Sequence, residues 1–373
     1  MDALRPVWAE VDLEAVRANV RSLQALVAPA AVCAVVKADG YGHGAVPVGR
    51  AAIEAGADFL AVALVEEGVE LRDAGIDAPI LVLAEPVPAA AETVVAHRLT
   101  PVVYTPAGID VLAKAVRTHG ANQPLDVHLK VDTGMHRVGC DPADAVELAA
   151  HVADRAELRL AGVCTHFAVA DEPGNDYTHA QQVTFEGVLA AIRSSGIPTG
   201  IVHACNTAGA IAIPDARYDM VRVGIGIYGI APSPALAGRV DLVPALAVKA
   251  RVSHVFGVPA GARVSYGLRY EATAPTTLAT VPIGYADGVP RELSHHGGEV
   301  LIRGCRRPIA GTVTMDQLMV DVGDDSIAVG DEVVLIGAQG DDRITADEWA
   351  AKMGTIAYTI VCGVGPRVPR RYL

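Results

Sequence analysis

The sequence predicts an α/β protein: a (β/α)8, TIM-like barrel followed by a mostly antiparallel β domain. Two observations carry this prediction. Between about residues 30 and 230, short apolar runs alternate with Ala-rich helical stretches. Beyond about residue 240, Val, Thr and Gly with frequent turn residues replace that alternation. With 373 residues, 51% of them hydrophobic, the chain is long enough to bury two cores.

Eight apolar runs in the first part of the chain have the composition of buried strands. They are Cys33–Lys37, Phe59–Ala63, Pro79–Leu83, Pro101–Tyr104, Asp126–Val131, Leu160–His166, Ile201–Asn206 and Met220–Gly224. Strands that are nearly all apolar and are separated by helices indicate a parallel sheet with a covered outer face. Eight such units in about 200 residues favour a closed barrel over an open, doubly wound sheet.

The segments between these strands have helical patterns. Helices are expected over Ala45–Ala55, Leu64–Ala74, Ala107–Thr118, Ala143–Ala153 and His179–Ser194. Gly56, Gly75, Gly120 and Gly196 follow four of them as stop signals, because glycine readily takes the left-handed conformation that ends a helix.

A pair of prolines, Pro232 and Pro234, interrupts the alternating pattern within Ala231–Ala237. We therefore expect the barrel to span residues 12–235 and the β domain residues 236–373. Strands of the β domain are expected within Leu246–Val258, Thr276–Tyr285, Glu299–Ile302, Gln317–Val322 and Glu332–Ile336. The opening run Pro6–Leu13 also alternates like a strand, and we expect the N-terminal strand, within residues 1–11, to pack with the β domain.

Composition and charge argue against several classes of protein. The balance of 30 Lys and Arg against 43 Asp and Glu gives a net charge of −13, so nucleic acid is a poor partner. No apolar stretch approaches the roughly 18 residues of a membrane span, and Asp2, Arg5 and Glu10 interrupt any signal peptide. The six cysteines form no C-x-x-C pair and the histidines no H-E-x-x-H motif. We expect a cytoplasmic protein with free thiols, no bound metal and no membrane partner.

Polar residues follow five of the predicted strands at their carboxyl ends, which in a barrel form the mouth of the active site. They are Lys37 after the first strand, Lys130 to Arg137 after the fifth, His166 after the sixth, Asn206 and Thr207 after the seventh, and Arg222 to Ile225 at the eighth. Each residue alone has an ordinary structural explanation, such as a snorkelling lysine or a capping asparagine. Five such strand ends are much less easily explained by chance.

These strand ends suggest a phosphorylated cofactor. Asn206–Thr207 and Gly224–Ile225 lie where barrels commonly bind phosphate. Desolvation of Lys37 would lower its pKa and make its amine a nucleophile or base. A phosphate site and a strand-end lysine together suggest pyridoxal 5'-phosphate, held by its phosphate and by a Schiff base.

The segment Ala34–Gly44, AVVKADGYGHG, resembles the cofactor-attachment signature of the alanine racemase family. Further blocks resemble those of the family in the same order: Lys130 to Gly139, His166–Phe167, Asp219 to Gly229, Ser265–Tyr266–Gly267, Pro282 to Gly288, Met315–Asp316–Gln317 and Pro366 to Tyr372. The resemblance covers essentially the whole chain. It implies an isomerase that interconverts L-alanine and D-alanine on a pyridoxal-phosphate aldimine and supplies D-alanine for peptidoglycan.

The resemblance also implies a role for each matching residue. Lys37 would form the internal aldimine and act as the base on one face, with Tyr266 as the base on the other. A tyrosine, whose ordinary pKa is about 10, needs positive charge or hydrogen-bond donors nearby, which the family supplies through His166 and Arg222. Cofactor contacts would come from Tyr41, Asn206, Thr207, Gly224, Ile225 and Tyr358 at the phosphate, Arg222 at the pyridine nitrogen and Arg137 at the phenolic oxygen. Arg137 and the backbone of Met315 would bind the substrate carboxylate, and Tyr285 and Tyr358 would narrow the entrance.

Further implications concern assembly and modification. The similar enzymes are homodimers in which Tyr266 and Met315 reach the lysine of the other subunit. Lys130 matches a lysine that is carbamylated in some of them; unmodified, it could pair with Asp132. A permanent charge at Arg222 should keep the pyridine nitrogen unprotonated and so limit quinonoid build-up and transamination. Thr359 stands where many relatives have glutamate, with little expected effect on the chemistry.

Three other functions are weighed against this one. The same machinery could act on another small amino acid such as serine. A pyridoxal-phosphate decarboxylase is less well supported, because Lys37 and Tyr266 together favour returning a proton to either face. A non-catalytic cofactor-binding protein of the barrel type is also disfavoured, because such proteins typically lack the C-terminal β domain.

Overall fold

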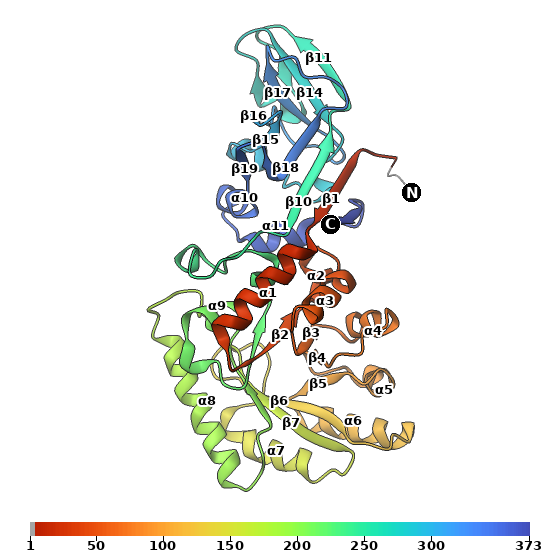
Figure 1. The fold of residues 1–373 in the computed structure, drawn as a ribbon, viewed down its shortest axis with the longest axis vertical. Coiled ribbons are helices and arrows are strands. Elements are labelled where there is room, and N and C mark those ends of the chain that lie inside the picture. Colours follow the sequence, from red (N-terminus) through yellow and green to blue (C-terminus); the bar gives the residue numbers. More distant parts are fainter. Residues whose placement is uncertain (1–3) are drawn as a thin grey trace. The chain divides into compact units, whose positions relative to one another are not determined.

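The computed structural model describes residues 4–373, which divide into two compact units (Figure 1). The first comprises Glu14–Gly40 and Ala45–Pro244. The second comprises Ala245–Leu373, Tyr41–Gly44 and the N-terminal segment up to Leu13. The short segment Tyr41–Gly44 therefore packs with residues that are far from it along the chain.

The first unit is a nearly closed barrel of eight parallel strands in the order β8-β7-β6-β5-β4-β3-β2-β9. The strands are β2 (Ala31–Val35), β3 (Phe59–Val62), β4 (Ile80–Val82), β5 (Thr100–Val103), β6 (Leu125–Lys130), β7 (Leu158–Cys164), β8 (Ile201–His203) and β9 (Met220–Val223). The two ends of this order, β8 and β9, are also joined: the Asp219 backbone donates to Val202 at 3.1 Å and the Arg222 backbone to Cys205 at 2.9 Å. The predicted fold class is confirmed.

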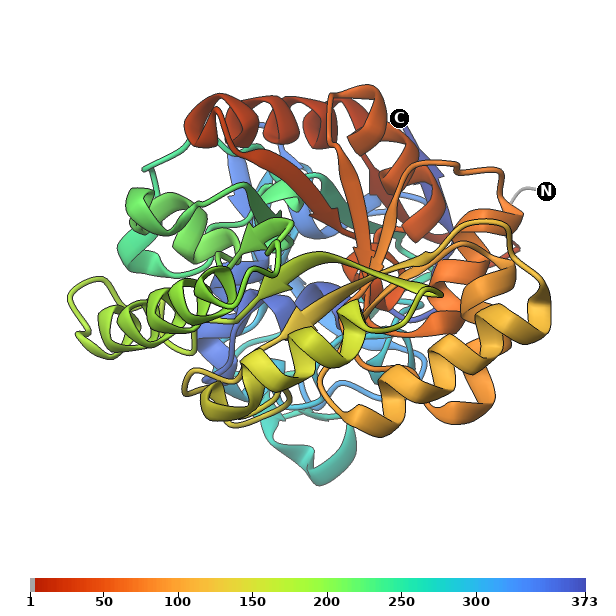
Figure 2. The same ribbon diagram turned by 90° about the horizontal axis from the view of Figure 1, so that it is seen from below.

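Helices surround the barrel strands (Figure 2). They are α1 (Leu13–Val27), α3 (Ala45–Glu54), α4 (Val65–Asp73), α5 (Ala91–Ala96), α6 (Pro106–His119), α7 (Ala145–Ala153), α8 (Tyr177–Ser194) and α9 (Thr207–Ala212). The short segment α2 (Lys37–Tyr41) has left-handed backbone and forms a turn after β2. Because helices cover the outer face, strand residues are buried on both faces, as for Val32, Cys33 and Ala34 of β2. This burial explains the nearly continuous apolar runs in the sequence.

Helix α6 illustrates how local sequence sets the ends of an element. The Thr105 hydroxyl accepts a hydrogen bond from the Gly108 backbone at 3.0 Å, and Pro106 occupies the first turn, where no backbone donor is needed. Gly120 ends the helix with φ +68°. The predicted helices match α3, α4, α6, α7 and α8, whereas α1, α5 and α9 were not predicted.

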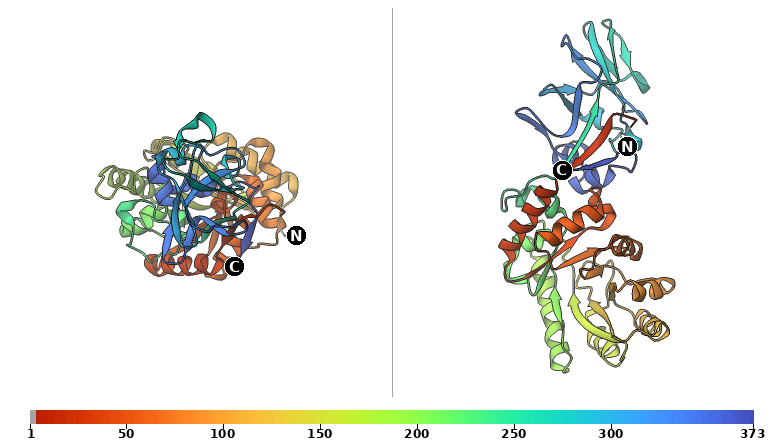
Figure 3. Two further views of the ribbon diagram at one scale, coloured as in Figure 1. Left: turned by 90° about the horizontal axis from the view of Figure 1, so that it is seen from above. Right: turned by 45° about the vertical axis from the view of Figure 1, so that its right-hand side comes forward.

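The second unit consists of mostly antiparallel sheets. A seven-stranded sheet has the order β16-β15-β18-β10-β1-β20 with β19 beside β18, and β11-β14-β17 and β12-β13 form smaller sheets. The strands are β1 (Val7–Val11), β10 (Leu246–Arg251), β11 (His254–Val258), β12 (Arg263–Val264), β13 (Tyr270–Glu271), β14 (Thr276–Val281), β15 (Glu299–Ile302), β16 (Cys305–Pro308), β17 (Leu318–Gly323), β18 (Glu332–Gln339), β19 (Asp342–Ile344) and β20 (Arg370–Tyr372). In Figure 3, right, β1 lies beside β10, with which it pairs antiparallel.

Two details of this unit differ from the sequence interpretation. The run Leu246–Val258 is divided between β10 and β11, which belong to different sheets. The unit also contains helices α10 (Ala346–Met353) and α11 (Ala357–Gly363). The Thr345 hydroxyl caps α10 through the Glu348 backbone at 3.0 Å, and Trp349 is buried on its inner face. None of the helices in residues 4–373 has both the length and the apolar character needed to cross a membrane.

Candidate active site

Lys37 lies just beyond β2, at the start of a left-handed turn. Residues 38–41 have φ values between 52° and 59°, although three of them are not glycine. Left-handed helical backbone costs roughly 1–2 kcal/mol per L-residue, so packing and hydrogen bonds must hold this turn. One such bond joins the Ala38 backbone N–H to Glu67 Oε1 at 2.6 Å. Strain of this kind next to a half-buried lysine is typical of a functional site.

Arg222 on β9 is buried, and its guanidinium is held by four groups. Nη1 donates to His203 Nδ1 at 2.7 Å. Nη2 lies 3.1 Å from His166 Nδ1 and donates to the carbonyls of Thr165 and Ala204 at 2.9 and 2.8 Å. Because arginine only donates hydrogen bonds, His203 Nδ1 must be an acceptor. An N–H on His166 Nδ1 would point at the guanidinium N–H groups, so Nδ1 is the unprotonated nitrogen of that ring as well.

The two histidines are therefore neutral, with the proton on Nε2. Burial, followed by the charge of Arg222, holds the pKa of His203 and of His166 well below the usual range. His203 Nε2 lies 2.7 Å from His128 Nδ1 and donates to it, and burial lowers the pKa of His128 to about 4. A buried chain of hydrogen bonds thus fixes the orientation of the Arg222 guanidinium.

Two short helical segments, α9 after β8 and Ile225–Tyr228 after β9, begin next to each other. Asn206 Oδ1 caps α9 by accepting from the Gly209 backbone at 2.9 Å, and the Gly224 backbone donates to Thr207 Oγ1 at 2.9 Å. A Cβ atom at Gly226 would lie only 2.7 Å from Thr207 Cγ2, so glycine permits this close approach. A hydroxyl and backbone N–H groups at helix starts suit an anion such as phosphate, so these residues fit the phosphate of pyridoxal phosphate.

Lys130, at the end of β6, is buried and lines a small hollow that also includes Arg137 and His166. Burial, together with the charges of Arg222 and Arg137, lowers the pKa of Lys130 to about 8. About a tenth of this amine is therefore unprotonated at pH 7, far more than for a lysine with the ordinary pKa of 10.5, and this favours reaction at its nitrogen.

The Asp132 carboxylate near Lys130 accepts hydrogen bonds from residues of its own turn. Oδ1 accepts hydrogen bonds from the backbones of Gly134 and His136, both at 3.0 Å, and Oδ2 lies 3.4 Å from His136 Nδ1. Burial raises the pKa of Asp132, but the backbone hydrogen bonds outweigh it and the net effect is a lowered pKa. Asp132 therefore serves chiefly to shape the turn that carries Arg137.

In the second unit, Tyr266, Tyr285 and Met315 line one open groove of about 600 Å³. All three are exposed, to 71%, 41% and 52% respectively. Because Gly284 has no side chain, its segment can lie close to Thr314 on the other side of the groove; a Cβ atom there would lie 2.2 Å from the Thr314 carbonyl oxygen. The backbones of Tyr285 and Ala286 donate to the carbonyls of Thr314 and Met315 at 3.0 and 3.1 Å.

Tyr41 and Tyr358 also lie together in the second unit, with ring centroids 6.1 Å apart. Burial raises the pKa of the Tyr41 phenol, which therefore stays protonated and can donate a hydrogen bond. Gly42, next to Tyr41, must be glycine, because a Cβ atom would lie 2.3 Å from the Val361 carbonyl oxygen. Arg370 donates to the Gly42 carbonyl through Nε and Nη2 at 3.0 and 2.8 Å.

The structure thus gathers the predicted residues into two sets. The barrel unit carries Lys37, Lys130, Arg137, His166, Asn206, Thr207, Arg222, Gly224 and Ile225 at the carboxyl ends of its strands. The second unit carries Tyr41, Tyr266, Tyr285, Met315 and Tyr358. In residues 4–373, no three His, Cys, Asp or Glu side chains gather in a way that could hold a metal ion.

Several supporting residues were missed from the sequence. His128 and His203 each stand inside an apolar strand, and that isolated polar position was the available signal. The fully buried Asp287 carboxylate, two residues after Tyr285, pairs with Arg5 through two hydrogen bonds of 2.8 Å. Nothing in the local pattern connects Arg5 with Asp287, which lie 282 positions apart.

Comparison with known families gives matches over nearly the whole chain. The model of the alanine racemase N-terminal domain matches residues 11–232, and that of the C-terminal domain matches residues 245–372. The alanine racemase of Symbiobacterium thermophilum is 51% identical over 100% of this chain and 98% of that protein. That of Desulfovibrio desulfuricans is 45% identical over 99% and 98%.

Solved structures give the same result. Alanine racemase from D-cycloserine-producing Streptomyces lavendulae has a TM-score of 0.95 and 42% identity, covering 100% of this chain and 98% of that one. Histidine racemase from Leuconostoc mesenteroides has a TM-score of 0.91 and 31% identity, covering 99% and 98%. One fold thus accommodates racemases named for two very different side chains.

Proposed function

This chain belongs to the alanine racemase family and is an amino-acid racemase, and from this premise we propose that it interconverts L-alanine and D-alanine with pyridoxal 5'-phosphate and two bases. The observation that carries the proposal is the full-length similarity to alanine racemases, which includes the Lys37 segment after β2. The product D-alanine would serve peptidoglycan synthesis. Six free cysteines, four of them buried, support action in the cytoplasm.

The proposed cofactor residues match the chemistry of the group. When bound, pyridoxal phosphate supplies an aldehyde that joins reversibly to amines and a ring that acidifies the α-hydrogen of an attached amino acid. Lys37 Nζ would hold the aldehyde carbon. The phosphate would be held by Asn206, the Thr207 hydroxyl, the backbones of Gly224 and Ile225, and the hydroxyls of Tyr41 and Tyr358. Arg222, orientated by His203 and His166, would face the ring nitrogen.

Two bases are needed because the α-hydrogens of the two enantiomers lie on opposite sides of the bound substrate. Lys37 Nζ would move the proton on one side and Tyr266 Oη on the other. His166, with its proton on Nε2, would donate a hydrogen bond that stabilises the ionised tyrosine oxygen. Arg137, with the backbone of Met315, would bind the substrate carboxylate, and Arg137 would also contact the phenolic oxygen of the cofactor.

We propose a homodimer in which Tyr266 and Met315 of one subunit complete the site of the other. The support is their exposure: a catalytic phenol that is 71% exposed on its own unit needs a further surface to exclude water. Tyr285 lines the same groove and, with Tyr358, would restrict the entrance to a small substrate.

Lys130 is proposed to be carbamylated. The neutral Lys130 amine, favoured by the pKa of about 8, would add to dissolved CO₂: an N–C bond forms, one C=O π bond becomes a carboxylate oxygen, and the nitrogen releases a proton to solvent. This replaces a buried cation next to Arg137 with an anion. The resulting carboxylate would pair with the Arg137 guanidinium and orientate it.

A racemisation assay tests the function. Wild type loaded with pyridoxal phosphate should form D-alanine from L-alanine with a higher kcat/KM than for L-serine or L-histidine. Histidine is included because a histidine racemase is among the similar structures. Lys37→Ala and Tyr266→Phe should each abolish racemisation. Bidirectional racemisation by Lys37→Ala would refute the mechanism, and cofactor binding without racemisation in wild type would favour a non-catalytic role.

A further inference from the structure

The Tyr266 turn is unusually constrained. Ser265, which is not glycine, has φ +65°, and Gly267 and Leu268 follow with φ values of +77° and +51°. Positive φ values at Ser265 and Leu268 are costly, so neighbouring structure must hold the backbone in this form. The exposed Tyr266 side chain makes the position of its backbone especially important for where the phenol points.

Thr312 holds this turn through two hydrogen bonds. Its hydroxyl donates to the Tyr266 carbonyl at 2.7 Å, and its own carbonyl accepts from the Ser265 hydroxyl at 2.6 Å. Thr312 is 1% exposed, so water does not compete for its hydroxyl. Gly311 allows the close approach, because a Cβ atom there would lie 2.5 Å from the Val264 carbonyl oxygen.

His295 holds Thr312 in turn. Its Nε2 lies 3.1 Å from Thr312 Oγ1, and because the Thr312 proton is donated to Tyr266, Nε2–H must be the donor. On the other side of the ring, Nδ1 lies 2.7 Å from Glu292 Oε2, which only accepts, so Nδ1–H donates as well and the ring carries both protons. Arg269 Nη1 lies 3.3 Å from the same nitrogen. The shorter contact, to Glu292, orientates the ring.

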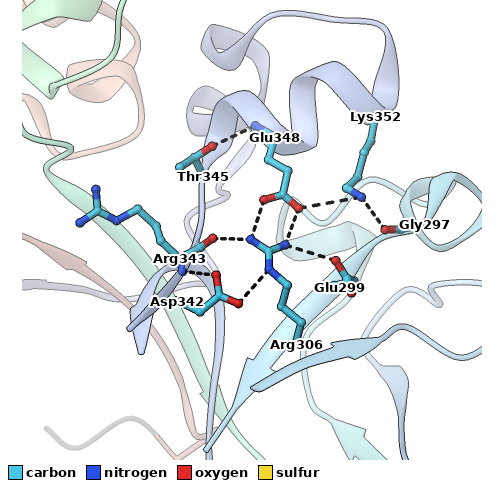
Figure 4. A network of polar contacts seen from close by, with 8 residues as sticks. All are labelled: Gly297, Glu299, Arg306, Asp342, Arg343, Thr345, Glu348 and Lys352. Atoms are coloured by element: carbon cyan, nitrogen blue, oxygen red, sulfur yellow. Dashed lines mark hydrogen bonds and ion pairs between the residues drawn. The ribbon is translucent and has the colours of Figure 1, made fainter. Parts of the chain in front are cut away.

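The short helix that carries His295, Leu293–His296, is itself anchored at both ends. Leu293 at its start is fully buried. Lys352 Nζ on α10 donates to the carbonyl of Gly297, the residue after the helix, at 2.7 Å. Figure 4 shows that this lysine belongs to a larger network, in which Glu348 of α10 contacts both Lys352 and Arg306.

Arg306 on β16 links α10 to strands β15 and β19 through its hydrogen bonds. Its guanidinium bonds both oxygens of Glu348 at 2.8 and 3.1 Å, and Asp342 and Glu299 at 3.0 and 3.2 Å (Figure 4). The helix that carries His295 is therefore connected, through Lys352 and Glu348, to the hydrogen bonds and ion pairs of Arg306.

We propose that His295 is a positioning residue for the second base: through Thr312 it sets the backbone of Tyr266 and hence the place of the phenolic oxygen. This inference rests on the proposed function of Tyr266. Loss of the link should slow proton transfer on the Tyr266 side of the substrate and leave the Lys37 side unaffected.

Exchange of the α-hydrogen in D₂O, followed by proton NMR for each alanine enantiomer, separates the two sides. In Tyr266→Phe, one enantiomer should stop exchanging while the other, deprotonated by Lys37, continues to exchange without inversion. His295→Ala should slow the same enantiomer about tenfold relative to the other, as expected when one positioning hydrogen bond is lost. Thr312→Val should give the same asymmetry.

Conservative variants and a neighbour provide the controls. His295→Gln keeps a donor near the position of Nε2, and Thr312→Ser keeps the hydroxyl, so both should restore the ratio of the two exchange rates. His296→Ala changes the adjacent, exposed histidine and should leave that ratio at the wild-type value. Thermal unfolding of each full-length variant reports whether it is folded.

The exchange rates separate failure of the positioning role of His295 from failure of the proposed function. An exchange ratio within twofold of wild type in both His295→Ala and Thr312→Val overturns the positioning role, whatever the overall activity. Equal slowing of both enantiomers also overturns it, because that pattern indicates a general structural loss. Wild type that neither racemises alanine nor exchanges its α-hydrogen refutes the proposed function instead.

Discussion

Heterodimers built from two inactive subunits should recover activity if the site is shared between subunits. One subunit would carry Lys37→Ala and the other Tyr266→Phe, each with a different affinity tag. These residues belong to different compact units, and Tyr266 is 71% exposed on its own unit. If each site takes its lysine from one chain and its tyrosine from the other, one site of the heterodimer carries both substitutions and the other carries neither.

The expected magnitude follows from this composition. A heterodimer purified through both tags keeps one intact site of two, so it should show about half the wild-type kcat with an unchanged KM. Random reassociation of equal amounts makes about half of all dimers heterodimers, so the mixture should show about a quarter of wild-type activity. The assay is D-alanine formation from L-alanine after each preparation is saturated with pyridoxal phosphate.

A matched heterodimer supplies the control. Lys37→Ala paired with Arg222→Ala places both substitutions in the barrel unit, so each site carries one of them and activity should stay low. If the Lys37→Ala and Tyr266→Phe heterodimer is as inactive as its parents, lysine and tyrosine of one chain form the site, and the shared-site proposal is refuted. Full activity in a verified monomer would refute it as well.

Three further predictions follow from individual contacts. The pKa of Lys130 is lowered from 10.5 to about 8, so between these pH values the lysine is protonated in the unfolded chain and neutral in the folded one. The free energy of unfolding of the unmodified protein should therefore rise as the pH increases from about 8 to 10.5, by about 3 kcal/mol in total. Urea unfolding across this range should show the gain in wild type and not in Lys130→Met, and an equal response of both would contradict it. Thr207→Val removes the acceptor of the Gly224 backbone and should weaken cofactor binding about tenfold in a titration of the apoprotein, whereas Thr207→Ser should bind as wild type does. Arg306→Met leaves Glu299, Asp342 and Glu348 facing one another. Because all four side chains are partly exposed and solvent screens their charges, it should lower the free energy of unfolding by only about 1 kcal/mol; an unchanged denaturation midpoint would contradict this.

Much of the barrel could be predicted because its strands are buried on both faces. Each strand therefore forms a short apolar run, and the residue that ends the run is placed at the mouth by the fold itself. The helices α1, α5 and α9 were not predicted, nor were α10 and α11, which lie in a region whose Val, Thr, Gly and turn residues favoured strands. For α10, a capping threonine and a buried tryptophan override that regional pattern.

The left-handed turn after Lys37 could not be predicted in the same way. Ala38, Asp39 and Tyr41 have no intrinsic preference for positive φ, and only the surrounding contacts, such as that of Glu67 to the Ala38 backbone, hold them there. Local sequence describes what a residue prefers, whereas a strained conformation is set by what its neighbours impose.

The sequence by itself determined the order of the two parts, the strand-end positions of Lys37, Lys130, His166 and Arg222, and the family to which these motifs point. Tertiary structure alone decided which side chains support them. The bonds from Arg222 to His203 and from Thr312 to Tyr266 join residues 19 and 46 positions apart. Such contacts depend on how strands and turns pack against one another, and no local periodicity encodes that packing.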